Sequence, residues 1–366
     1  MIKLWSAQIR SVIRLEMKKT FFAKRGLWVY VLALLPFLLF FGYAVTTSRL
    51  QEQSARLALQ NEKPLTHQDL RAIQLGMTSE EVVALLGKPP LHSHWTKPRP
   101  LENGGFASIP RESYRYSDGS NELSLELEDG KVERVHLHEG YNLGDDSIMF
   151  AGVFQFFYIR LAVFFGCLGI FMNLFRGEIL DRSLHFYFLA PIRREVLTVG
   201  KFLAGLLATC VIFVTSELLQ IIAFTWHFSP NARDLYLYHN HGLAHAVMYL
   251  GVTALACLGY GAFFLAAGML FRNPILPAAV ILVWEAVNPF LPSLLKQVSV
   301  IYYLKSLCPV NIPTPPDTPP LFAMLVSNPD PVSAPVAVIG VVTVALLALF
   351  ASSLRARRME INYTTE

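Results

Sequence analysis

Three charged residues stand within long apolar segments of the sequence: Arg160, Glu217 and Glu285. A charge inside a membrane is costly, so it usually faces a partner of opposite sign or a polar pathway. Two interpretations remain open. Arg160 forms a buried ion pair with one of the two carboxylates and orders the helices, or the three charges line a substrate pathway.

Residues with metal-binding chemistry also occur, as closely spaced histidine pairs. The pairs are His92 with His94, His136 with His138, and His241 with His245. Two imidazoles on one face can contribute to a zinc site. No cysteine accompanies them and the sequence fixes no third ligand, so we expect surface or interfacial histidines and no metal.

The sequence contains no motif for nucleotide binding or hydrolysis. Val199, Gly200 and Lys201 have the form of the end of a phosphate-binding loop, but the preceding glycines are missing. Neither the nucleophile turn of hydrolases nor a zinc-protease motif occurs. We therefore predict that this chain is not an enzyme and holds no cofactor itself.

The elements that position these residues are predicted to be membrane-spanning helices. Hydrophobic residues make up 53% of the 366 residues and charged residues 16%, against about 25% charged residues in a typical soluble domain. Lipid cannot bond free backbone groups, so spans through its ~30 Å core are helical. The predicted spans are residues 27–45, 148–175, 202–226, 243–271, 274–295 and 333–354. We expect a mainly α, polytopic protein with a six-helix membrane domain.

Basic residues predict the orientation of these spans. Segment 1–26 carries seven Lys and Arg, and segment 173–201 carries five more, whereas the short loops on the other side carry Arg233, Lys296 and Lys305. Because basic residues near span ends favour the cytoplasm, we expect both termini, including the tail 355–366, to be cytoplasmic. Anionic lipid headgroups suit this basic surface, so membrane lipids and not nucleic acid are the expected partners.

Residues 1–26 have the pattern of a basic amphipathic helix. Trp5 lies on the apolar face, and Arg10, Arg14 and Lys18 lie on the adjacent one. A basic amphipathic helix beside a span commonly lies in the plane of the membrane interface, and we expect this here. The alternative is an ordinary basic flank that only fixes the topology.

Residues 46–147 form a predicted α+β domain inserted between the first two spans, on the extracytoplasmic side. Their net charge is −5, opposite in sign to the rest of the chain. Two short helices are expected, the second with a capping box of Thr78 and Glu81. Strands are expected at 112–117, 122–128 and 131–137, with a hairpin turn at Asp129-Gly130.

This insert resembles the SmpA/OmlA (BamE-like) domain of bacterial envelope proteins, over roughly residues 65–138. The matching positions are Gly76, Met77, Thr78, Val82, Leu85, Leu86, Gly87, Pro89, Gly130 and Lys131. The resemblance implies a small helix–helix–sheet module that contacts an extracytoplasmic protein partner and has no catalytic role.

Residues 176–201 are charged and aromatic although they lie between two predicted spans. The residues of interest are Glu178, Asp181, Arg182, Phe186, Tyr187, Pro191, Arg193 and Arg194. Exposed aromatic residues are common anchors of protein interfaces, so we expect this segment to dock onto a soluble partner. The alternative is an ordinary cytoplasmic loop whose basic residues fix the topology, which gives no reason for the aromatic run or for Pro191.

Residues 177–205 (GEILDRSLHFYFLAPIRREVLTVGKFLAG) resemble the cytoplasmic segment of ABC-2 type transporter permeases. An acidic start, a short amphipathic helix, a proline followed by a basic residue, and a Gly-Lys pair at the next span recur in that family. The resemblance covers the chain except residues 46–147, whose length departs from the short first outer loop of most members. It implies a separate ATP-binding cassette ATPase subunit that uses ATP and Mg²⁺, a second permease subunit, and the bacterial inner membrane as the location.

Two functions follow from these resemblances. In the first, the chain is a permease subunit that couples ATP hydrolysis by the ATPase subunit to export of a lipidic or envelope-related substrate. In the second, it is a non-transporting scaffold or mechanotransmitter that acts on an extracytoplasmic partner through residues 46–147. A membrane enzyme is a third possibility, without a constellation of catalytic groups to support it.

Overall fold

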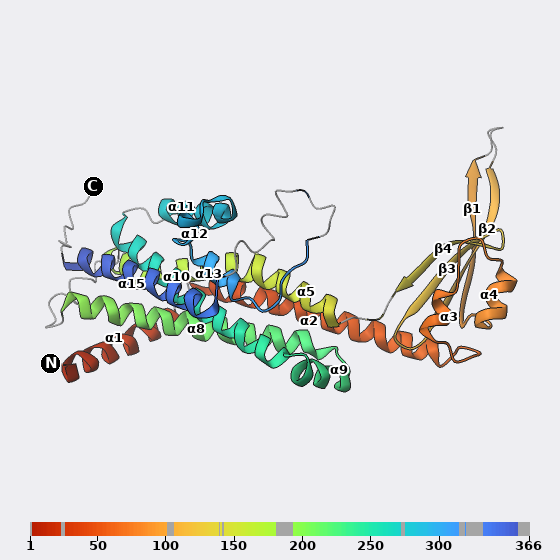
Figure 1. Cartoon of the computed structure of the whole chain (residues 1–366), viewed down its shortest axis with the longest axis horizontal. Helices are drawn as coiled ribbons and strands as arrows, with labels where there is room; N and C mark the ends of the chain where they lie inside the picture. The colour runs from red at the N-terminus through yellow and green to blue at the C-terminus, as the bar shows by residue number, and fades with distance from the viewer. Residues whose placement is uncertain are drawn as a thin grey trace. The chain divides into compact units, whose positions relative to one another are not determined.

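The computed structural model describes residues 2–22, 26–100, 106–138, 140, 143–180, 193–271, 275–314, 319 and 332–357. The chain forms two compact units (Figure 1). One consists of Met1–Phe41 with Ser147–Glu366 and is called the membrane unit here. The other, Gly42–Asp146, is called the sheet unit. The predicted docking residues Asp181, Arg182, Phe186, Tyr187 and Pro191 lie outside the described residues.

The membrane unit is helical. Its longer helices are α1 (Ile2–Phe22), α2 (Leu27–Ala58, which continues into the sheet unit), α5 (Leu143–Gly152), the π-helical segment η2 (Val153–Val163), α6 (Phe164–Leu180), α8 (Arg194–Trp226), α10 (Gly242–Leu270), α11 (Ile275–Val287) and α15 (Ala334–Arg357). Its shorter elements are α9 (Pro230–Asp234), η3 (Leu235–His239), η4 (Asn288–Phe290), α12 (Ser293–Lys296) and α13 (Val300–Ser306).

Within the described residues, five helical stretches are long and apolar enough to cross a membrane. They are Leu27–Ala58, Leu143–Phe175, Arg194–Trp226, Gly242–Leu270 and Ala334–Arg357, so the chain has the character of a multi-pass membrane protein. The sixth expected span, residues 274–295, contains α11, a helix of 13 residues. At 1.5 Å per residue such a helix is about 20 Å long, shorter than the ~30 Å hydrocarbon core. The expected count of six spans is therefore not confirmed.

The interior of the membrane unit is built around α10, which packs against α6, α8 and α15. Aromatic rings fill the space between helices: the ring of Phe150 lies 5.0 Å from those of Phe40 and Phe224. Small residues allow close approach, as at Gly166, where an added Cβ would overlap the ring of Phe213. Close contact through small residues is a common way for helices to associate in membranes.

The sheet unit combines the end of α2 with two short helices and a four-stranded sheet. The helices are α3 (His67–Arg71) and α4 (Ser79–Leu86), and the strands are β1 (Leu91–Pro100), β2 (Phe106–Ser117), β3 (Glu122–Glu128) and β4 (Lys131–His138). The strands are antiparallel and follow the chain in the order β1-β2-β3-β4. Both predicted short helices and all three predicted strands are present.

Local sequence signals in the sheet unit are confirmed in detail. Thr78 caps α4 in a capping box with Glu81, and Asp129 and Gly130 both have positive φ in the β3–β4 turn, which a type I′ hairpin requires. Strand β1, in contrast, was not predicted. Its sequence LHSHWTKPRP contains two prolines and has no alternation of apolar and polar residues, so it carries no strand signal of its own.

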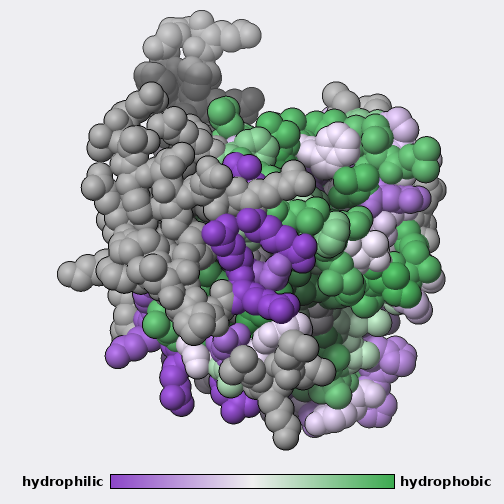
Figure 2. All heavy atoms as spheres, turned by 90° about the vertical axis from the view of Figure 1, so that its left-hand side faces the viewer, coloured by the Kyte–Doolittle hydropathy of each residue, from purple (hydrophilic) through white to green (hydrophobic). Residues whose placement is uncertain are grey.

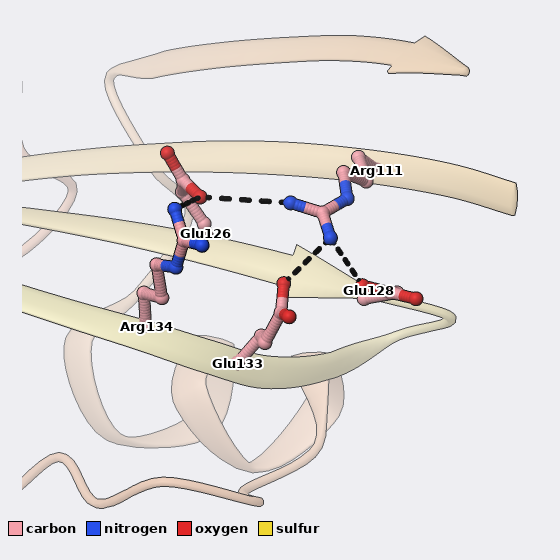
Figure 3. A network of polar contacts seen from close by, with 5 residues as sticks. All are labelled: Arg111, Glu126, Glu128, Glu133 and Arg134. Carbon is pink, nitrogen blue, oxygen red and sulfur yellow. Dashed lines mark hydrogen bonds and ion pairs between the residues drawn. The ribbon is translucent and has the colours of Figure 1, made fainter. Parts of the chain in front are cut away.

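The two faces of the sheet differ in character. Leu123, Leu125 and Leu127 of β3 point inward and form one core with residues of α3 and α4. The opposite face carries charges: Arg111 of β2 bonds Glu128, and its guanidinium also lies 2.9 Å from Glu133 and 3.8 Å from Glu126. Figure 3 shows this network, which Arg134 extends through Glu126. The alternation of inward and outward residues follows from the period of a strand.

Candidate functional site

The beginning of α8, residues 193–201, joins four helices and is called the α8 base here. Its last residue, Lys201, is fully buried. Its Nζ donates hydrogen bonds of 2.8 Å to Oε1 of Glu16 in α1 and of 2.8 Å to the carbonyl oxygen of Leu174 in α6. The ammonium also lies 5.1 Å from the ring centroid of Phe175. Lys201 thus ties α8 to both helices, and the buried carboxylate of Glu16 lies against its charge.

The sequence allows α1 to come this close because Gly200 precedes the lysine. A Cβ at Gly200 would lie 3.0 Å from Cγ1 of Val12, and Val12 itself is buried. Glu16 lies one helical turn after Val12, on the same face of α1. The Gly-Lys pair therefore provides a hydrophobic contact and an ion pair to the same face of one helix.

A second contact between α1 and the α8 base involves a predicted interfacial residue and a predicted docking residue. The Cζ atom of Arg193 lies 5.2 Å from the ring centroid of Trp5, the geometry of a cation–π interaction. Trp5 is half-buried. The apolar face of α1 is therefore directed, at Trp5, Val12 and Glu16, toward α8.

On another side, the α8 base contacts the end of α15. The Nη1 atom of Arg194 donates hydrogen bonds of 3.4 Å and 3.1 Å to the carbonyl oxygens of Ala356 and Arg357. In return, Nε of Arg357 lies 2.6 Å from Oε1 of Glu195. A guanidinium at the end of a helix satisfies carbonyl groups that have no partner within the helix.

The remaining basic residues predicted for α1 lie on the surface. Arg10, Arg14 and Lys18 are all exposed. Figure 2 views the end of the membrane unit where α8 begins and α15 ends: hydrophilic residues gather at the centre of its described surface, with hydrophobic residues beside them. Glu178 belongs to α6, which ends at Leu180 directly before the residues outside the described part.

Among the described residues, the three charges predicted within the spans form no ion pair with one another. The carboxylate of Glu285 in α11 accepts hydrogen bonds of 2.8 Å from Oγ of Ser299, 3.0 Å from the amide of Val300 and 2.9 Å from the amide of Ile301. These amides begin α13, so Glu285 caps that helix from outside. A carboxylate at this position satisfies otherwise unpaired N–H groups.

Arg160, in η2, interacts electrostatically with Glu285 and Tyr260 and lies 5.6 Å from the ring centroid of Phe156. Among the described residues no hydrogen bond reaches its Nε or Nη2. Glu217, in α8, is fully buried. Neither of its carboxylate oxygens has a hydrogen-bond partner among the described residues. Neither glutamate is within ion-pair distance of Arg160 among the residues the structure describes.

Sequence reasoning overlooked Glu16 and the partner of Lys201. A signal for Glu16 was present: it is the one acidic residue in α1, a helix that is otherwise basic, and it falls on the face of Trp5 and Val12. A lone carboxylate on the apolar face of a basic helix indicates a buried basic partner, because a charge there is costly without one.

Comparison with known proteins gives no relative for this arrangement. No family model, curated protein or solved structure matches the chain.

Proposed function

We propose that the chain is the permease subunit of an ATP-binding cassette transporter. It would couple ATP hydrolysis by a separate ATPase subunit to export of an envelope-related or lipidic substrate across the bacterial inner membrane. The observation that carries this proposal is the α8 base: residues 193–201, the last part of the predicted docking segment, are fastened to α1, α6 and α15. The family resemblance of residues 177–205 supplies the partner.

The geometry suits the transmission of movement. A force applied before Arg193 reaches α1 through Lys201 and Glu16, and reaches α15 through Arg194 and Glu195. The 33 residues of α8 extend over about 50 Å at 1.5 Å per residue. A rigid helix of that length carries a displacement at one end to the other.

In this proposal the α8 base faces the cytoplasm. Arg10, Arg14 and Lys18 of α1 are exposed and would contact anionic headgroups, each with about 1 kcal/mol of attraction near the membrane surface. A second permease subunit would complete the complex. The buried charges Arg160, Glu217 and Glu285 would order the bundle or line the pathway.

The proposal is tested by purifying the tagged full-length chain from its native membranes together with any ATPase. The expected partner is identified by mass spectrometry and by hydrolysis of ATP in the purified complex. Arg193→Ala/Arg194→Ala is expected to reduce the amount of ATPase retained. Arg233→Ala is the matched control, because Arg233 also bonds helix-end carbonyl groups, those of Thr225 and Trp226, at the far end of α8.

Loss of the ATPase from the double variant, but not from the control, supports the proposal. If no ATP-hydrolysing subunit accompanies the wild-type chain, or if both variants retain it equally, docking at the α8 base is refuted.

The scaffold function remains the second candidate because the sheet unit has a core of its own. Replacing residues 59–141 by a short Gly-Ser linker separates the two functions. ATP-dependent export that persists after the replacement supports a permease. A scaffold is supported by two results together. The wild type exports nothing, and the replacement loses a bound envelope protein while it still hydrolyses ATP.

A further inference from the structure

The two edges of the sheet in the sheet unit differ. The strand order puts β1 at one edge and β4 at the other (Figure 1). At the start of β4, the amide of Val132 donates to the carbonyl oxygen of Met77 at 2.9 Å, and the amide of Gly76 donates to that of Val132 at 2.8 Å. Within the described part of the chain, β1 has backbone hydrogen bonds to no segment other than β2, and residues 91–96 are all exposed. The edge of β1 is therefore open.

The register of the sheet fixes which backbone groups of β1 point outward. The amide of Asp129 donates to the carbonyl oxygen of Pro110 at 3.2 Å, so the carbonyl group of Pro110 in β2 is directed away from β1. Residues of an antiparallel strand bond its two neighbours in alternation. Thr96, which is paired with Pro110, therefore directs its N–H and C=O groups away from β2. Every second residue shares this direction, so the backbone groups of His92 and His94 also point outward.

Two prolines agree with this direction and limit the length of the open edge. Pro98 and Pro100 continue the same alternation and have no N–H group. Proline on an edge strand is tolerated where the N–H group would face outward, and it blocks pairing with another chain there. The outward donors of β1 therefore belong to His92, His94 and Thr96. Alternate residues of a strand are about 7 Å apart, so these donors have the spacing that a second extended strand can match.

The open part of β1 is backed by the rest of the sheet. Residues 91–95 pair with residues 111–115 of β2, which in turn pair with β3. On one face, the ring of His92 lies 5.0 Å from that of Tyr114, a residue of the core. An apolar side chain added next to His92 on this face would extend the core. Leu91 and Trp95 lie on the other face and are 46% and 40% exposed.

The charge of β1 indicates the chemistry of its partner. Its sequence, LHSHWTKPRP, contains two histidines, Lys97 and Arg99, and no acidic residue. Arg115, paired with Leu91, is 54% exposed. The carboxylate of Glu112 in β2 already accepts a hydrogen bond of 2.6 Å from the hydroxyl of Tyr114. Pairing with β1 of a second copy would bring like charges together, whereas an acidic strand would have the complementary charge.

We propose that the edge of β1 binds an extended acidic segment of a protein partner, which joins the sheet as a further strand antiparallel to β1. Its backbone bonds the N–H and C=O groups of His92, His94 and Thr96. Every second side chain is apolar and packs on the face of Tyr114, and the side chains between them are acidic and lie on the face of Arg115. In strand addition, main-chain hydrogen bonds supply affinity and alternate side chains supply specificity. This interaction does not depend on the proposed coupling to an ATPase.

The test uses the full-length chain in detergent, with fluorine-labelled tryptophan, and a synthetic peptide of alternating Val and Glu as the probe. Trp95 is the one tryptophan of the sheet unit, and its signal is assigned with the variant Trp95→Phe. The peptide is expected to shift this signal until the site is saturated. A peptide with Lys in place of each Glu is the charge control, and we expect it to bind about ten-fold more weakly because it meets the basic strand with like charge.

Peptides with methylated amides identify the mode of binding on the wild-type chain. In the proposed strand, the Val residues lie opposite His92 and His94, and their amides face β1. Methylation of the Val amides should therefore abolish the shift of the Trp95 signal. Methylation of the Glu amides, which face away from β1, should preserve it. Any other pattern would overturn the proposed strand.

A pair of chain variants tests the same contact from the other side. Thr96→Pro removes one outward N–H group, as Pro98 and Pro100 already do, and is expected to weaken binding of the Val-Glu peptide about ten-fold. Thr96→Val keeps the N–H group and should bind as the wild type does. Urea unfolding, followed by the Trp95 signal, checks that the sheet is intact in both variants.

Three results would overturn the proposal. The first is equal binding of the peptide to Thr96→Pro and Thr96→Val when both are folded. The second is a Trp95 signal that stays unchanged up to the solubility limit of the peptide. The third is a cross-link between residues 91–96 of two copies of the chain, which would assign this edge to a subunit interface. If Thr96→Pro does not fold, the methylated peptides still decide the question, because they require no change to the chain.

Discussion

Lys201 in the membrane unit and Arg111 in the sheet unit both bind carboxylates, but in different surroundings. Lys201 is fully buried and bonds the carboxylate of Glu16, which has 4% of its side chain exposed. Arg111 is 11% exposed and lies near three carboxylates, of which Glu133 is 40% exposed. The first cation and the carboxylate of Glu16 are shielded from water, whereas the second cation lies among carboxylates that are partly exposed to water.

This difference has an energetic consequence. Removing one partner of a buried pair leaves an uncompensated charge, at a cost of about 3–5 kcal/mol. Exposed pairs contribute about 0–1 kcal/mol because water and salt screen them. The buried pair of Lys201 and Glu16 should therefore matter more than the whole network on the sheet.

The largest effect is expected from Lys201→Met. This variant removes the cation that lies 2.8 Å from the buried carboxylate of Glu16, and we expect it to lower the free energy of unfolding by about 3–5 kcal/mol. Thermal or denaturant unfolding of the purified chain in detergent measures this loss. Lys18→Met, on the exposed face of the same helix as Glu16, is the control and should change little.

A double variant separates a pair from two unrelated charges. Glu16→Leu/Lys201→Met removes both charges, and we expect it to recover most of the lost stability, since an apolar replacement of a buried pair is often neutral. Losses of the two single variants that simply add in the double variant would contradict a coupled pair.

The next largest effect is expected from Glu285→Ala. Three hydrogen bonds to the carboxylate would be lost, two of them from backbone amides that begin α13. We expect a loss of about 3 kcal/mol, because the amides remain buried without a partner. Glu285→Gln keeps one acceptor oxygen and should lose less. Equal stability of Glu285→Ala and wild type would show that water replaces the carboxylate.

These two sites also mark how far the sequence alone could lead. The apolar surroundings of Glu285 predicted a constrained charge, but its partners are 14 to 16 residues away along the chain, in a segment without a strong helical pattern. Lys201 and Glu16 are separated by 185 residues. No local period encodes such a contact, so both residues could be recognised as unusual without their partners being predicted.

Local structure was more accessible than these contacts. The capping box of Thr78 and Glu81 and the turn at Asp129-Gly130 depend on residues adjacent in sequence, and both are present. Strand β1 has no such local signal, since it forms by pairing with β2. The end of α11 at Val287 also depends on its surroundings, because the apolar run that predicted a span continues beyond this residue.

A smaller effect is expected from Arg111→Met in the sheet unit. The guanidinium bonds Glu128 and lies near Glu126 and Glu133 (Figure 3). Its loss leaves the carboxylates to repel one another. We expect the free energy of unfolding, measured by urea denaturation, to fall by about 1–2 kcal/mol, and added salt to make this loss smaller. Arg115→Met is the control, because Arg115 is 54% exposed and lies 3.9 Å from Glu122. A loss as large as that of Lys201→Met would remove the contrast between the two sites.

The smallest effect is expected at Glu81, an exposed carboxylate that bonds the backbone amide of Thr78. It is detected through the dependence of the free energy of unfolding on pH. Hydrogen bonds from the amide and side chain of Thr78 lower the pKa of Glu81 below its ordinary value of 4.5. A lowered pKa in the folded state stabilises the protein above pH 4.5, and this contribution is lost as the pH falls through the folded-state pKa. The signal of fluorine-labelled Trp95, in β1, follows urea unfolding of the sheet unit.

In Glu81→Gln, the free energy of unfolding should therefore fall less than in the wild type as the pH is lowered. Glu80→Gln, one residue earlier on the same turn, removes a carboxylate that has no hydrogen bond among the described residues, and its curve should run parallel to that of the wild type. Identical curves for the two variants would mean that the capping box contributes nothing through charge. A smaller dependence on pH found only in Glu81→Gln would show that a carboxylate fully open to water still stabilises the fold where a backbone amide and a side-chain hydroxyl, and no cation, bond it.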